Sequence, residues 1–139
     1  MTIKDVEQQI VEEFEIFPDW LDKYEYIIEL GKSLPIINEG GRDERNLIKG
    51  CQSRVWLAAD YKDGKIIFTA DSDAIITKGI ISLLVRVFSG RTPKEIIDAD
   101  LKFIKDIGLE ENLSPARANG LLSMIKQIKF YAVAFASNK

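Results

Sequence analysis

The sequence contains no histidine and only one cysteine, Cys51. Without an imidazole, a cysteine protease or acyltransferase of the Cys-His kind has no group that takes up a proton and returns it to a leaving group. With a single thiol, an intramolecular disulfide and a dithiol redox cycle are both excluded. Two roles remain for Cys51: reaction with a group on another molecule, or a structural place in the packing.

Long apolar runs are also missing. The most hydrophobic segment, 74–88, is interrupted by Lys78 and Arg86 and is shorter than the roughly 20 apolar residues that cross a bilayer, so we expect a buried helix there. Segment 1–17 is acid-rich and has no continuous apolar stretch typical of a signal peptide. A lone cysteine without a disulfide framework fits a reducing compartment. Together these features predict a cytoplasmic protein with no membrane association.

The charge is unevenly distributed along the chain. The net charge of -3 argues against electrostatic binding to nucleic acid, which requires a basic face. The first thirty residues carry nine acids against Lys4 and Lys23, whereas Arg117, Lys126, Lys129 and Lys139 follow Ser114 with no acid. The simplest explanation is two solvated helix faces of opposite sign; a dedicated docking surface is the alternative.

The length of 139 residues, with 46% hydrophobic and 29% charged residues, predicts a single globular domain spanning 1–139. Residues 5–17 have apolar positions at helical spacing and precede Pro18. Asp19 can cap a second helix over 20–30, with Gly31 as its stop. Residues 32–45 have no period and predict a surface loop.

Two alternating segments around Asp63-Gly64 predict a β-hairpin beginning at Arg54. Residues 46–49 are expected to add a short strand, which would place Cys51 on the loop that enters the hairpin. Segment 75–88 then predicts a buried helix, with 71–73 at its N-terminus. Short helices are expected from Thr92-Pro93 and over 101–107, and a long one from Ser114-Pro115 to about residue 136. The last has Leu121, Leu122, Ile125, Ile128 and Ala132 on its predicted apolar face. This order predicts an α+β fold with a small antiparallel sheet packed against helices.

The neighbours of Cys51 favour a reactive thiol over a packing role. Gly50 frees the backbone before the sulfur, and Gln52 and Ser53 are hydrogen-bonding loop residues. Lys49 and Arg54 are both positive, and cations close to a thiol lower its pKa and increase the fraction of thiolate. We therefore expect a thiol of lowered pKa, provided that these cations lie near the sulfur in space.

Residues 46–56, Asn-Leu-Ile-Lys-Gly-Cys-Gln-Ser-Arg-Val-Trp, resemble the signature of the SufE family, sulfur-acceptor proteins of the bacterial Suf iron–sulfur assembly pathway. Further segments agree with that family in order and spacing, and a set of ordered segments is far more specific than one motif. They are 26–31 with 34–35 beyond it, 71–74 leading to 78–79, and 115–117 followed by 120–121. The resemblance covers the chain from about residue 20 to residue 132.

The resemblance implies a SufE/IscU-like single domain in which Cys51 accepts sulfane sulfur as a persulfide. The donor would be a pyridoxal-phosphate-dependent cysteine desulfurase of the SufS or CsdA type, whose turnover the chain would stimulate, and the acceptor a SufBCD-like assembly complex. The pyridoxal phosphate belongs to the desulfurase, so neither a cofactor nor a metal is expected on this chain. Thiol–persulfide exchange needs no acid–base histidine, which agrees with the absence of histidine.

The same resemblance gives five further residues a partner-binding or loop-supporting role: Gly50, Gln52, Ser53, Asp73 and Arg117. By residue type alone, Asp73 would be a helix cap. Arg117 would reach an acidic group of a partner or the loop, unless it is simply solvated. Because a persulfide is labile, we expect the loop to shelter the sulfur at rest and to extend it in a complex.

Three other functions compete with this one. An iron–sulfur scaffold usually supplies four thiolate or imidazole ligands, which one cysteine and no histidine cannot provide within a chain. A non-catalytic interaction module with a structural Cys51 would use the acidic helices to bind or regulate another protein. A one-cysteine peroxidase would need a cation-lined pocket and an external reductant, for which no further residues are evident.

Overall fold

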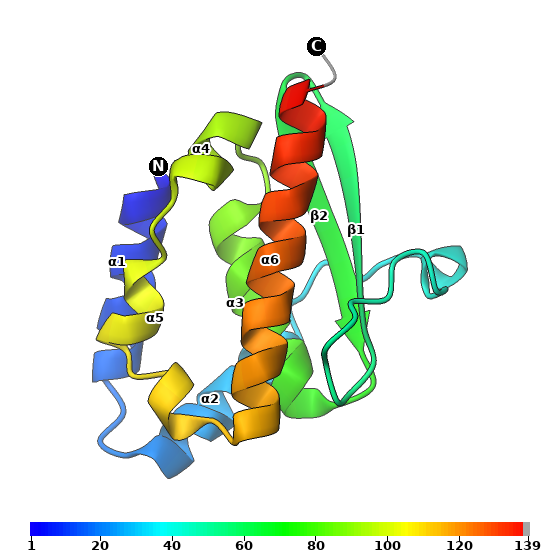
Figure 1. Cartoon of the computed structure of the whole chain (residues 1–139). Coiled ribbons are helices and arrows are strands. Elements are labelled where there is room, and N and C mark those ends of the chain that lie inside the picture. The colour runs from blue at the N-terminus through cyan, green and yellow to red at the C-terminus, as the bar shows by residue number, and fades with distance from the viewer. Residues whose placement is uncertain (138–139) are drawn as a thin grey trace.

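The computed structural model describes residues 1–137 and begins with two helices, α1 (Ile3–Glu15) and α2 (Trp20–Gly31) (Figure 1). The helix α1 begins at Ile3 rather than at residue 5 because Thr2 and Asp5 form a reciprocal capping box. Asp19 caps α2 as predicted, accepting a hydrogen bond from the backbone N–H of Asp22 at 3.0 Å.

The predicted β-hairpin is present. Strands β1 (Val55–Lys62) and β2 (Lys65–Ser72) pair antiparallel, with Lys62 opposite Lys65. The connecting residues Asp63 and Gly64 have φ angles of 52° and 78°, the left-handed conformation that two-residue hairpin turns require. The Asp-Gly pair therefore sets the register of the hairpin.

The helix α3 (Ile75–Phe88) is the buried helix that the sequence predicted. It is followed by α4 (Pro93–Asp98), which has a Thr92–Glu95 capping box, and by α5 (Lys102–Asp106). The long helix α6 (Pro115–Ser137) lies beside α3 and the hairpin in Figure 1, and α1 and α5 lie on the far side. Short 3-10 turns are η1 (Glu39–Gly41) and η2 (Glu110–Asn112). The fold is α+β, as predicted. Within residues 1–137, every helix is too short or too polar to cross a membrane.

The helix α2 ends within one residue of the prediction: Gly31 is its last residue, buried, and Lys32 is the C-cap. A Cβ atom at Gly31 would lie 3.0 Å from the backbone nitrogen of Gly79 on α3, and one at Gly79 would lie 2.1 Å from the carbonyl oxygen of Ile27. The two glycines let α2 and α3 approach closely, a tertiary requirement that local sequence does not reveal.

The predicted apolar face of α6 is correct for Leu121, Ile128 and Ala132, which are buried, but wrong for Leu122. The side chain of Leu122 is 51% exposed. Its position is one residue beyond the buried Leu121, which is just over a quarter of a turn around the helix.

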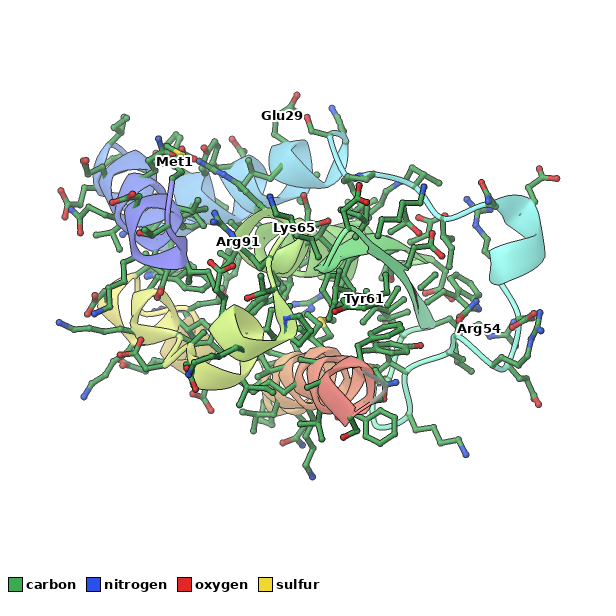
Figure 2. The ribbon with its side chains drawn as sticks, turned by 90° about the horizontal axis from the view of Figure 1, so that it is seen from above. Met1, Glu29, Arg54, Tyr61, Lys65 and Arg91 are labelled. Carbon is green, nitrogen blue, oxygen red and sulfur yellow. The ribbon has the colours of Figure 1, made fainter. Side chains whose placement is uncertain are left out.

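The loop 32–54 projects beyond the hairpin, and Figure 2 shows it from above with Arg54 near its end. Ile37 donates its N–H to the carbonyl of Ala70 at 3.1 Å. The strand expected at 46–49 is reduced to a single bridge between Leu47 and Trp56. The loop is thus tied to both strands.

Candidate functional site

Cys51 lies at the centre of a short loop tip that we call the Cys51 flap, residues 49–53. On its N-terminal side the chain is fixed to β1: Ile48 donates to the carbonyl of Val55, and Leu57 donates to the carbonyl of Asn46, both at 2.8 Å. As the sequence predicted, the cysteine occupies the connection that enters the hairpin.

On the C-terminal side, Arg54 is fixed to the start of α3. Its N–H donates to the carboxylate of Asp73 at 3.1 Å, and its carbonyl accepts from the N–H of Asp73 at 3.2 Å. The hydroxyl of Ser72 also donates to that carbonyl, at 2.8 Å. Asp73 is therefore not the cap of α3, as its residue type suggested; its carboxylate secures the base of the flap. The hydroxyl of Ser72 accepts from the N–H of Ala74 instead.

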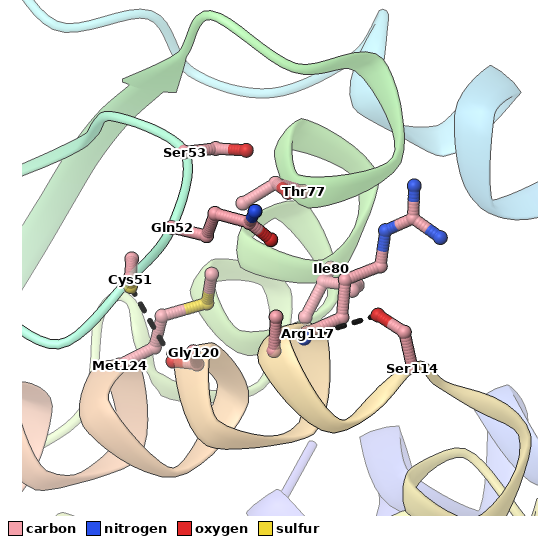
Figure 3. A pocket seen from close by; sticks show the side chains of 10 residues that line it. Cys51, Gln52, Ser53, Thr77, Ile80, Ser114, Arg117, Gly120 and Met124 are labelled. Atoms are coloured by element: carbon pink, nitrogen blue, oxygen red, sulfur yellow. Dashed lines mark hydrogen bonds between the residues drawn. The ribbon is translucent and has the colours of Figure 1, made fainter.

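Between these two anchors the flap rests on α6. Gly50 has a φ of 94°, and a Cβ atom there would lie 2.5 Å from the hydroxyl oxygen of Ser123. The thiol of Cys51 donates to the carbonyl of Gly120 across 3.7 Å, drawn as a dashed line in Figure 3. Among residues 1–137 this is the one hydrogen bond that joins the flap to the rest of the protein. The flap is held by its two ends and by one weak contact in its middle.

The thiol of Cys51 is half-buried, and burial raises its pKa above the ordinary value. Desolvation has this effect because it disfavours the charged thiolate. Lys49 and Arg54 do not lower the pKa as the sequence suggested: both side chains are exposed, and the effect on the thiol is that of burial. In this conformation burial disfavours the thiolate of Cys51, which is its nucleophilic form.

A pocket of about 290 Å³ opens beside Cys51, between the flap, α3 and the first turns of α6. Gln52 and Ser53 line it from the flap, and the side chain of Gln52 points into it (Figure 3). Arg117 lines it from α6, but its guanidinium points away from the sulfur. The wall also includes Thr77, Ile80, Ser114, Ala116, Gly120 and Met124.

The structure thus brings together all the predicted site residues: Gly50 within the flap, Asp73 at its base, and the others around the pocket. Sequence reasoning assigned no role to Gly120 or Ser123, the residues of α6 that the flap touches. The one sequence signal for Gly120 was its place in the segment 120–121, which resembles the family. Among residues 1–137 no group of three His, Cys, Asp or Glu side chains is arranged to hold a metal ion.

Comparisons with known proteins agree with this geometry. A family model described as "Fe-S metabolism associated domain", SufE, matches residues 8–132. An uncharacterized SufE-like protein of Rhizobium meliloti is 43% identical over 126 residues, covering 87% of this chain and 90% of the relative. An uncharacterized SufE-like protein of Synechocystis sp. is 39% identical over 127 residues, covering 91% of this chain and 80% of the relative.

A solved structure shares the fold. The solution structure of a hypothetical protein from Thermus thermophilus matches with a TM-score of 0.78 and 22% sequence identity, covering 95% of this chain and 96% of that one. At this identity the match establishes the arrangement of helices and strands, and nothing about activity.

Proposed function

This chain belongs to the SufE family, and on that basis we propose that Cys51 receives sulfane sulfur for iron–sulfur cluster assembly. The coarse role, a part in iron–sulfur metabolism, follows from the family. The observation that supports the specific role is the position of the single thiol on a flap that one hydrogen bond holds against α6.

The transfer step needs no group beyond the two sulfurs. The thiolate of Cys51 attacks the outer sulfur of a cysteine persulfide on the donor, the sulfur–sulfur bond of the donor breaks, and the donor cysteine leaves as a thiolate. One sulfur atom moves, and one sulfur–sulfur bond forms as another breaks. The thiol of Cys51 loses one proton, and the thiolate released from the donor can take up one. No external oxidant or reductant is consumed.

The donor of this proposal is a pyridoxal-phosphate-dependent cysteine desulfurase of the SufS or CsdA type, and the pyridoxal phosphate stays on that enzyme. By removing sulfur from the desulfurase, the chain would accelerate its turnover without being a stand-alone enzyme. The persulfide would then pass to a SufBCD-like assembly complex. These partners would place the protein in the cytoplasm.

The burial of Cys51 supports a flap with two states, one closed on α6 at rest and one lifted in a complex. At rest burial raises the pKa of the thiol and so lowers its thiolate fraction, which protects it because the thiolate is the form that is oxidised. Lifting the flap removes one hydrogen bond, worth about 1 kcal/mol, and returns the thiol to water, where it ionises more easily. With its ends fixed at Ile48 and Arg54, the flap can project the thiol by at most roughly 10 Å.

In this scheme Gly50 supplies the backbone freedom for the movement, and Asp73 keeps the base of the flap in place while the tip moves. Gln52 and Ser53 line the pocket that the outer sulfur would enter, and Arg117 stands at its exposed edge.

The test is mass spectrometry of the protein after anaerobic incubation with a cysteine desulfurase and cysteine. We expect a gain of about one sulfur atom on Cys51, removed by a thiol reductant. Cys51→Ser is expected to abolish both the gain and the stimulation of desulfurase turnover. Full stimulation by Cys51→Ser would contradict the relay and support an interaction module with a structural cysteine.

A further inference from the structure

The outward side of α6 exposes large apolar side chains to water. Leu122 is 51% exposed, Phe130 64% and Val133 52%, although each would be expected inside a helix-packed core. Seen from above (Figure 2), α6 forms one edge of the molecule, and no other segment lies outside it. Phe130 and Val133 lie about two and three turns beyond Leu122 on the helix. Where exposed apolar side chains form a patch on a monomer, that patch often binds another protein.

The end of this side that lies beside the Cys51 flap also carries the lysines Lys126 and Lys129. A shallow hollow of about 610 Å³ is lined by Leu122 and Lys126, together with Asn119, Ser123, Ile125 and Lys129; we call these six residues the Leu122 patch. A second hollow shares Ser123 and Lys126 with it and continues past Glu44 and Arg45 to Lys49 on the Cys51 flap. The patch is therefore continuous with the flap.

The lysines around the flap differ in their partners within the protein. Lys129 donates to the carbonyls of Ile96, Ile97 and Ala99 at 3.2, 3.1 and 2.6 Å, which fixes it to the end of α4. By contrast, no carboxylate of residues 1–137 forms an ion pair with Lys49 or Lys126. Since these cations do not lower the pKa of Cys51 either, they are available to a partner.

We propose that the Leu122 patch, with Lys49 at its edge, is the docking surface for the sulfur donor, which meets it with an apolar centre bordered by carboxylates. This inference rests on the proposed function and adds where the donor binds. Leu122 is the apolar anchor, and Lys126 and Lys49 pair with acidic groups at the rim.

Two arguments favour the sulfur donor as the protein that binds this patch. The donor must bring its persulfide to Cys51, so it covers surface next to the flap, and the patch is an apolar and cationic part of that surface. The chain as a whole has a net charge of -3, so the carboxylates of the proposed donor surface are attracted only where cations are in local excess. Between Ser114 and Ser137 the sequence contains no acid, so α6 supplies that excess.

The experiment compares Leu122→Asp and Lys126→Glu with the unchanged chain. The dissociation constant for a pyridoxal-phosphate-dependent cysteine desulfurase is measured, together with the rates at which that enzyme and inorganic polysulfide place sulfur on Cys51. We expect Leu122→Asp to weaken binding and transfer from the enzyme by about tenfold or more, and Lys126→Glu by about three- to tenfold, with a weaker salt dependence. Transfer from polysulfide, which needs no docking surface, stays unchanged.

Matched controls are Leu21→Asp, an exposed leucine on α2, and Lys105→Glu, an exposed lysine on α5. Both are expected to bind the desulfurase as the unchanged chain does, and thermal unfolding verifies that all four variants are folded. Unchanged binding by Leu122→Asp and Lys126→Glu would overturn the docking surface alone. If sedimentation shows that these variants instead break a self-association of this chain while desulfurase binding is intact, the patch belongs to a second copy and the proposal is wrong.

The proposed function fails in a different way from the docking surface. In that case the unchanged chain itself gains no sulfur from the desulfurase, whatever the state of the patch.

Discussion

The carbonyl oxygen of Gly120 accepts the thiol hydrogen bond of Cys51 across 3.7 Å, and a Cβ atom at Gly120 would lie 3.5 Å from the same sulfur. A single position of α6 thus supplies both the hydrogen-bond partner and the space for the resting thiol. The closeness of the two residues determines how securely the flap is closed.

Gly120→Val is expected to expose Cys51. The added Cβ is at contact distance, and its methyl groups would occupy the space of the sulfur, so the flap is displaced. Loss of the contact, worth about 1 kcal/mol, predicts an increase of about fivefold in the rate of alkylation of Cys51 by iodoacetamide at constant pH. Gly120→Ala, which adds the Cβ alone, is the control and should stay near the original rate. Equal rates for both variants would show that Gly120 does not hold the flap.

The alkylation rate of Cys51 should depend on pH with a midpoint above that of a solvated thiol, about 8.5, because burial raises its pKa. In urea, where the chain is unfolded, the midpoint should fall to the solvated value. The folded state holds the thiol proton more tightly than the unfolded state, so the free energy of unfolding should decrease as pH rises above about 8.5. Cys51→Ser removes that decrease. A folded-state midpoint below about 8.5 would mean that Lys49 and Arg54 act on the thiol after all.

Gly79→Ala is expected to destabilise the protein by about 3 kcal/mol or more, because its Cβ would lie 2.1 Å from the backbone oxygen of Ile27 and would force α2 and α3 apart. Urea unfolding monitored by circular dichroism measures the loss. Gly40→Ala is the matched control, since a Cβ there meets no atom within 4 Å. Similar stability for the two variants would show that the helices can separate at little cost.

Glu13 joins three helices. Its carboxylate on α1 accepts from the guanidinium of Arg86 on α3 at 2.8 and 2.5 Å and from the hydroxyl of Tyr26 on α2. The hydrogen bonds from Arg86 hold the pKa of Glu13 below its usual range. Its contribution to stability is therefore present above the pKa of an unfolded glutamate, about 4.3, and is lost as pH falls through the lower folded value.

Glu13→Gln should lower the free energy of unfolding at pH 7 by about 1–2 kcal/mol and flatten its fall in acid, measured by urea unfolding across pH 3 to 7. Glu12→Gln, an exposed change on the same helix, should leave both unaltered. Parallel pH curves for Glu13→Gln and the original chain would contradict the ion pair.

Much of the fold was predictable because it depends on local interactions. Asp19 and the Thr92–Glu95 pair cap helices at the predicted positions, and Asp63-Gly64 adopts the left-handed angles that a two-residue turn needs. Each of these signals acts over four residues or fewer, so the local sequence carries it. The prediction of a strand at 46–49 was wrong except for one bridge, because pairing at a sheet edge depends on how the long loop brings this segment to β1.

The sequence by itself determined the lone thiol of Cys51, the motif around it, the helices and the hairpin, and with them the family. Only the tertiary structure decided that α6 buries the thiol and raises its pKa, that Asp73 fixes the flap instead of capping α3, and that Leu122 faces water. The reason is physical: desolvation and side-chain exposure depend on segments that are distant in the chain, here 69 residues apart for Cys51 and Gly120.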